Sequence, residues 1–126
     1  QALAVVRESA AFWDRDRAFA PDLAATLAKV TDDAPVVLMA HEPDVARRVP
    51  SRVAVQLSGH THGGQVRMLG WSPISPSGQQ LAYGHIKMNC DVVVSGGLGC
   101  SIMPFRLGVP PEIVLVTLGA PRPAVA

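Results

Sequence analysis

The chain has 126 residues, of which 48% are hydrophobic and 17% are charged, and its formal net charge is +1. Disordered chains combine low hydrophobicity with high charge, so this composition excludes a disordered tail and predicts a folded domain with a substantial core. The 11 Lys and Arg residues stand against 10 Asp and Glu residues, which leaves no basic excess. We therefore expect no nucleic-acid partner, because binding to the phosphate backbone depends on such an excess.

The first half of the chain predicts short strands that alternate with short helices. Continuous apolar runs indicate buried strands at Leu3–Val6, Val36–Ala40 and Val53–Ser58. Apolar residues at helical spacing predict a helix over Asp22–Val30. We expect a second helical stretch over Val45–Val49, with Asp44 as its capping residue.

The second half predicts mostly strands and glycine-rich turns. Gly59–Gly64 breaks the third strand, and Gly70–Gln80 has the prolines, serines and glycines of a surface loop. Three further strands are predicted over Leu81–Met88, Asp91–Ser95 and Glu112–Leu118. The fold class predicted for the chain is therefore α/β, rich in strands and with short helices.

Histidines follow two of the predicted buried strands directly. His41 comes after the strand at Val36–Ala40, and His60 and His62 come after the strand at Val53–Ser58. Ligand sites in layered α/β folds collect at the carboxyl ends of strands, and imidazole is a good ligand for zinc, iron and similar ions. The pattern predicts a metal site formed by His41, His60 and His62. His85 lies inside a predicted strand and has no such setting.

Two segments around these histidines resemble a known family. Gly59-His60-Thr61-His62-Gly63-Gly64-Gln65 resembles the Gly-His-x-His signature of calcineurin-like metallophosphoesterases, and Met39–Asp44 is similar to an upstream histidine segment of the same family. Within that family the two segments are similar to those of a bacterial subgroup of membrane-associated phosphoesterases. Gly96–Gly99, Phe105–Gly108 and Pro110–Ile113 resemble the closing segment of this subgroup.

The resemblance implies an αββα sandwich that holds a binuclear metal centre. It assigns His41 and His60 to one divalent ion, such as Mn, Zn or Fe, and His62 to the other. The implied activity is hydrolysis of a phosphomonoester or phosphodiester by a metal-activated hydroxide. The implied partner is a phosphate-ester substrate, with a lipid headgroup among the candidates. The resemblance also implies a full-length bacterial protein that associates with membranes through segments outside this chain, which itself should be soluble.

Three motifs of the family are absent from the 126 residues: Asp-x-His, Gly-Asp and Gly-Asn-His. We therefore expect residues 1–119 to form the carboxyl-terminal half of a metallophosphoesterase domain, with a tail at 120–126. Such a chain should bind at most one ion, be inactive alone and associate with itself through uncovered apolar surface. Two alternatives are a non-catalytic module that binds a single metal and a subunit that completes a site with another chain.

Other polar features carry weaker predictions. Arg67 and Arg106 are candidates for binding substrate phosphate, because the planar guanidinium matches phosphate oxygens. Gly96–Gly99 could cradle a phosphate, although a tight turn is the favoured interpretation. Cys90 and Cys100 flank a predicted strand, and free buried thiols are favoured over a disulfide.

Overall fold

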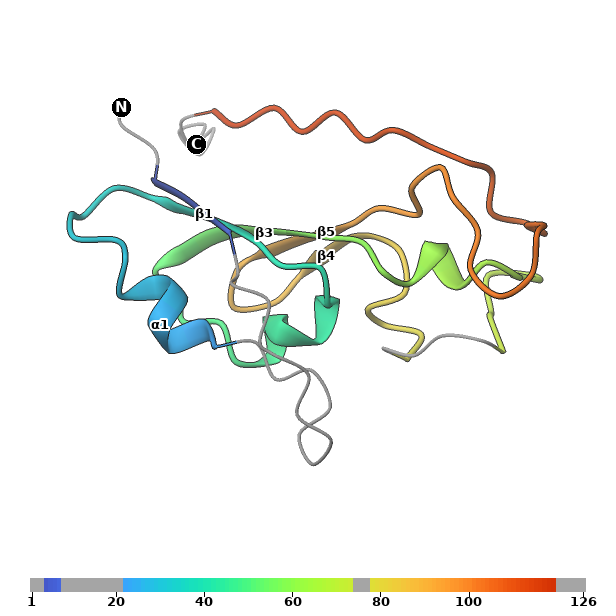
Figure 1. Ribbon diagram of the computed structural model, residues 1–126, viewed down its shortest axis with the longest axis horizontal. Coiled ribbons are helices and arrows are strands. Elements are labelled where there is room, and N and C mark those ends of the chain that lie inside the picture. The colour runs from blue at the N-terminus through green and yellow to red at the C-terminus, as the bar shows by residue number, and fades with distance from the viewer. Residues whose placement is uncertain (1–3, 8–21, 74–77, 120–126) are drawn as a thin grey trace, which may run out of the picture.

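The structure, a computed structural model, describes residues 4–7, 22–73 and 78–119 (Figure 1). The predicted tail at 120–126 lies outside these residues. A single five-stranded sheet organises the described part of the chain, with the strand order β1-β2-β3-β5-β4. The strands are β1 (Ala4–Arg7), β2 (Val36–Met39), β3 (Val53–Ser58), β4 (Gly84–Lys87) and β5 (Asp91–Val94).

The sheet is parallel except at one edge. β1, β2, β3 and β5 run in the same direction, and β4 pairs antiparallel with β5. The carboxyl ends of β2, β3 and β5 therefore meet at one edge of the sheet, where the predicted site residues follow. The prediction of a strand-rich α/β fold is confirmed.

The helices are few and short, and none among the described residues is long and apolar enough to cross a membrane. Helix α1 (Leu23–Leu27) begins as predicted at Asp22, whose side chain accepts a hydrogen bond of 2.9 Å from the Ala25 amide. The predicted helix at Val45–Val49 is instead the 3₁₀ helix η1 (Pro43–Arg47). Pro43 begins this helix two residues early, because proline suits the first helical position. The predicted capping role of Asp44 is therefore wrong.

One face of the sheet carries the core. Buried side chains of β2 and β5 pack with η1 and α1, which both lie on the lower side of the sheet in Figure 1. The residues of this core from the sheet, η1 and the chain just after η1 include Val36, Leu38, Val45, Val49, Val92 and Val94. On the opposite face Met39 is 45% exposed, and Leu57 and Val93 are only partly buried. The parallel sheet therefore has a second apolar face that the described residues do not fully cover.

The strand predicted at Glu112–Leu118 is wrong, because this segment has no regular structure. It runs on the side of the sheet opposite α1 (Figure 1), and Ile113 and Leu115 are 84% and 91% exposed. A strand needs a neighbour that pairs with its backbone groups, and no described strand pairs with this segment. The strand predicted at Leu81–Met88 also shortens to β4, and Leu81 is buried in the core just before it.

Candidate functional site

The carboxyl edge of the sheet brings two of the predicted histidines together. His41 follows β2 and His60 follows β3, and the backbone ladder continues past both strands, since the Gly59 amide donates to the His41 carbonyl at 3.2 Å. His41 Nε2 and His60 Nδ1 lie 3.1 Å apart, and their rings are nearly perpendicular. Adjacent parallel strands thus place two imidazole nitrogens at the spacing that two ligands of one ion would have.

Glu42 joins this pair of histidines. Its Oε1 lies 3.3 Å from His60 Nδ1, the same nitrogen that faces His41. The Glu42 side chain is 24% exposed, so the carboxylate is partly shielded from water. His60 Nδ1 therefore lies close to two other atoms that can donate an electron pair, His41 Nε2 and Glu42 Oε1.

His62 lies in the 3₁₀ helix η2 (His62–Gly64), and its ring is engaged elsewhere. Its Nδ1 is 3.1 Å from the carbonyl oxygen of Gly99, in the loop that follows β5. Within the part of the chain that the structure describes, no three His, Cys, Asp or Glu side chains form a group that could hold a metal ion. The described residues therefore fit part of a metal site, the pair His41 and His60, and do not complete one.

Polar residues fix the loop that carries His60 and His62. The buried Thr61 hydroxyl donates to the Ala82 carbonyl at 2.6 Å and accepts from the Gly63 amide. The Gln65 side chain, also buried, accepts from the Ser101 amide at 2.7 Å and donates to the Met103 carbonyl at 3.0 Å. The loop after β3 is thus bonded both to the chain before β4 and to the loop after β5.

Two glycines of this loop have no room for a side chain. At Gly63, where φ is +66°, a Cβ would lie 2.5 Å from a methyl group of Val109. At Gly64, where φ is +84°, a Cβ would lie 2.4 Å from the Ser72 hydroxyl oxygen. The Gly63-Gly64 pair of the motif is therefore explained by left-handed backbone and close packing.

The two arginines predicted to bind substrate both contact the chain itself. Arg67 Nε donates to the Gly70 carbonyl at 2.9 Å, and its guanidinium lies 5.7 Å from the centre of the Tyr83 ring. Arg67 Nη1 is buried and has no hydrogen-bond partner among the described residues. Arg106 donates to the carbonyl groups of Gly96, Gly99 and His62. Both arginine side chains are half-buried and bonded to backbone carbonyls, and their substrate role stays a prediction.

The loop at 95–99 is a turn held by Glu112, in line with the favoured prediction. Glu112 Oε1 accepts from the Gly96 amide at 2.9 Å, and Oε2 accepts from the Tyr83 hydroxyl at 2.6 Å. The Tyr83 hydrogen bond is the main cause that lowers the pKa of Glu112, and the same bond raises the pKa of Tyr83. The amides of Gly96 and Gly97 already have acceptors, so they do not form an open phosphate cradle.

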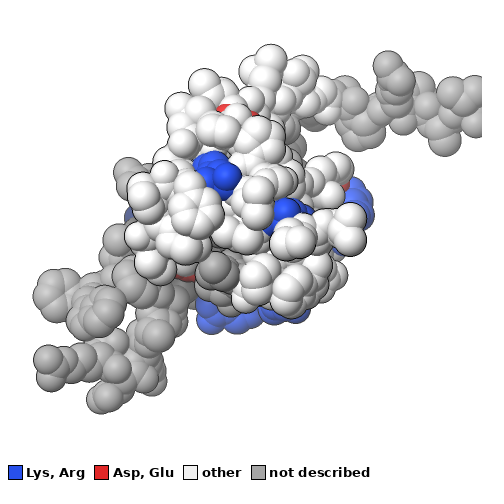
Figure 2. All heavy atoms as spheres, turned by 90° about the vertical axis from the view of Figure 1, so that its right-hand side faces the viewer, with Lys and Arg blue, Asp and Glu red and all other residues white. Residues whose placement is uncertain are grey.

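The face at this end of the molecule is mostly uncharged. The loops at 59–73 and 95–109 contain no Asp or Glu, whereas they contain Arg67 and Arg106. Figure 2 shows Lys and Arg side chains emerging among uncharged residues on this face, with almost no Asp or Glu in view. These two loops therefore carry positive charge beside the histidines, although the Glu42 carboxylate lies 3.3 Å from His60 Nδ1.

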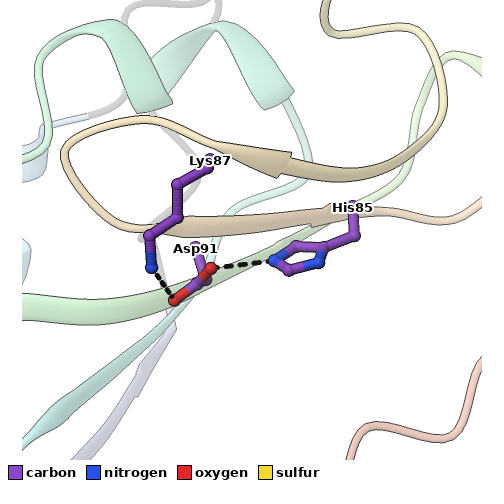
Figure 3. Close-up of polar contacts among 3 residues, drawn as sticks. All are labelled: His85, Lys87 and Asp91. Carbon is purple, nitrogen blue, oxygen red and sulfur yellow. Dashed lines mark hydrogen bonds and ion pairs between the residues drawn. The ribbon is translucent and has the colours of Figure 1, made fainter. Parts of the chain in front are cut away.

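His85, which the sequence did not place in the site, belongs to a separate cluster on β4 and β5 (Figure 3). Its Nε2 lies 2.8 Å from Asp91 Oδ1, and Lys87 Nζ lies 2.7 Å from Asp91 Oδ2. The Lys87 bond, followed by that of His85, lowers the pKa of Asp91. The two cysteines are free as predicted; Cys90 is buried, with a pKa raised by burial, but Cys100 is exposed.

Three residues of this region were not predicted from the sequence. Glu42 could have been found, because it follows His41 directly and a carboxylate beside a histidine is a common ligand pair. Tyr83 and Glu112 carry no such signal, since they lie 29 positions apart and meet only in the folded chain. The role of the Gly99 carbonyl has no side-chain signature at all.

Comparison with curated proteins finds several relatives named as metallophosphoesterases. An uncharacterised metallophosphoesterase of Bacillus subtilis, YkuE, is 37% identical over 102 residues, which cover 78% of this chain and 36% of YkuE. Uncharacterised metallophosphoesterases of Aquifex aeolicus and Helicobacter pylori are 35% identical over 89 residues and 34% identical over 104 residues. These matches cover 66% and 79% of this chain, and 32% and 28% of the two relatives.

The chain therefore belongs to the metallophosphoesterase family. It spans about a third of the length of the curated relatives that it matches. No family model and no solved structure matches the chain.

Proposed function

We propose that the chain forms part of a metal-dependent phosphoesterase and supplies the histidines of its metal centre, while residues outside these 126 supply the rest. The observation that carries the proposal is the pair of imidazole nitrogens, His41 Nε2 and His60 Nδ1, 3.1 Å apart at neighbouring strand ends. Family membership supports hydrolysis of a phosphate ester as the reaction.

We assign the three histidines to two metal ions. His41 and His60 together would hold one divalent ion, with the Glu42 carboxylate beside them. His62 Nδ1 is bonded to the Gly99 carbonyl, and the assignment of His62 to a second ion follows the family resemblance. Bound ions would supply positive charge that stabilises the phosphoryl oxygens.

The chain alone should be inactive. Two dications a few ångströms apart repel one another strongly, and a bridging carboxylate normally offsets that repulsion. His41, His60 and His62 are neutral when they act as ligands, and the family motifs that supply bridging and catalytic groups are absent from the sequence. The positive, acid-free loops around the site would still favour the approach of a phosphate group.

Hydrolysis of a nitrophenyl phosphodiester in the presence of Mn²⁺ or Zn²⁺ tests the proposal. The chain as given should act no faster than buffer with metal. A chain extended at its amino terminus to include the three missing motifs should turn over the substrate. His60→Ala and His62→Ala should abolish that turnover, whereas His85→Ala should retain it, because His85 contacts Asp91 instead.

Two results would overturn the proposal. Rapid metal-dependent turnover by the 126-residue chain, lost in His62→Ala, would show that the site needs no further residues. An extended chain that binds metal through the histidines but hydrolyses no phosphate ester would favour a non-catalytic metal-binding module.

A further inference from the structure

The Arg106 side chain donates hydrogen bonds to the backbone carbonyls of both His62 and Gly99, the two residues joined by the hydrogen bond of the His62 ring. Arg106 Nε donates to the Gly99 carbonyl at 3.0 Å, and Nη2 donates to the Gly96 carbonyl at 2.6 Å and also to Gly99. Nη1 donates to the His62 carbonyl at 3.3 Å. The planar guanidinium therefore joins the turn at 96–99 to the backbone of η2.

The Gly99 carbonyl determines which nitrogen of His62 carries the proton. Its oxygen lies 3.1 Å from His62 Nδ1, and a carbonyl oxygen can only accept a hydrogen bond. Nδ1 must therefore be the donor, and a neutral His62 keeps its free electron pair on Nε2. A rotation of the Gly99 peptide would remove this constraint.

Two features show that His62 and its acceptor need to be held. His62 has a φ of +51°, a left-handed conformation that costs free energy for a residue other than glycine. Glu112 fixes the other side of the turn, because its carboxylate accepts from the Gly96 amide while Arg106 donates to the Gly96 carbonyl. Side chains therefore hold both the amide and the carbonyl of Gly96.

We propose that Arg106 is a positioning residue that keeps the Gly99 carbonyl against His62 Nδ1 and so presents His62 Nε2 as the free electron-pair donor. The use of Nε2 toward an ion rests on the proposed function. The tautomer itself does not, because it follows from the contacts of this chain alone.

The test is a long-range ¹H–¹⁵N NMR spectrum of the histidine-labelled chain, recorded without metal or substrate at a pH where imidazole is neutral. Wild-type His62 should carry its proton on Nδ1. Arg106→Gln should lose this form as the main tautomer, and Arg106→Lys should not restore it, because one ammonium cannot reach three carbonyls. Arg47→Gln, which removes an exposed arginine paired with Asp44, should leave His62 unchanged.

A wild-type His62 with its proton on Nε2 would overturn the proposal, as would an Arg106→Gln chain that keeps the Nδ1 proton. Arg106→Lys provides the same comparison if Arg106→Gln fails to fold, and the wild-type tautomer is decisive by itself. The NMR test contains no ion or substrate, so it is independent of the activity assay. If Arg106→Gln changes the His62 tautomer as expected but the extended chain has no phosphoesterase activity, only the proposed function is contradicted.

Discussion

Asp91 is a single carboxylate that binds two cationic partners on the sheet surface (Figure 3). Lys87 and His85 hold its pKa below the ordinary value of 3.8. A carboxyl group with a lowered folded-state pKa stabilises the fold above its unfolded pKa, and this contribution is lost as pH falls through the folded pKa. All three side chains are at least 36% exposed, so the contribution should be small.

We expect Asp91→Asn to lower the free energy of unfolding by less than about 1 kcal/mol at pH 7, and by still less below pH ~3. Urea denaturation of the wild-type chain and of Asp91→Asn, each at the two pH values, measures this difference in the free energy of unfolding. An equal effect at both pH values would show that the carboxylate charge is not responsible. High salt should weaken the effect at pH 7, because exposed ion pairs are screened.

The bond between Tyr83 and Glu112 has a different setting, because it is partly buried and joins the residue just before β4 to the segment at 112–118. Tyr83→Phe should lower the free energy of unfolding by about 1 kcal/mol, the usual net contribution of one hydrogen bond. Glu112→Gln should cost more, since it also weakens the acceptor for the Gly96 amide. A double-mutant cycle measures the coupling, and strictly additive losses would contradict a direct bond.

Among the elements, two leucines that each lie in an apolar run of the sequence have opposite surroundings in the fold. Leu38 in β2 is fully buried, whereas Leu115 in the segment at 112–118 is 91% exposed. Leu38→Ala should therefore lower the free energy of unfolding by about 2–5 kcal/mol, and Leu115→Ala should change it by less than about 0.5 kcal/mol. A large loss in Leu115→Ala would show that its segment packs in solution.

The same contrast explains which elements could be predicted from sequence. The bounds of β3 and most of β2 were predicted, because their mainly apolar runs are typical of strands in a parallel sheet. Glu112–Leu118 has an equally apolar run, but whether it forms a strand depends on a partner that local pattern does not reveal. The pair His41 and His60 followed from strand-end positions, whereas the contact of His62 with Gly99 depends on a loop 37 positions away.

At the scale of the whole molecule, exposed apolar side chains gather at the end that carries the histidines. They lie in the two loops after β3 and β5, and they are Met68, Leu69, Trp71, Leu98, Ile102, Phe105 and Leu107. Leu69 and Ile102 are almost completely exposed, and both have positive φ. Monomeric proteins rarely expose a contiguous apolar patch of this kind, so the chain should associate with itself.

We expect light scattering to show association that increases with concentration. Leu69→Ser combined with Ile102→Ser should weaken it without loss of stability, because neither side chain contributes to the core. Ala54→Ser, at an exposed position of β3, serves as the control. A monodisperse monomer at high concentration that binds no dye specific for apolar surface would contradict this expectation.

We expect the chain to carry the histidines of a metal centre that it does not complete. Calorimetric titration with Mn²⁺ or Zn²⁺ above the histidine pKa range near 6.5 tests it directly. We predict at most one weakly bound ion per chain, lost in the His41→Ala/His60→Ala double variant and retained in His85→Ala. Equal binding by the double variant and the wild type, or two tightly bound ions per chain, would contradict the account.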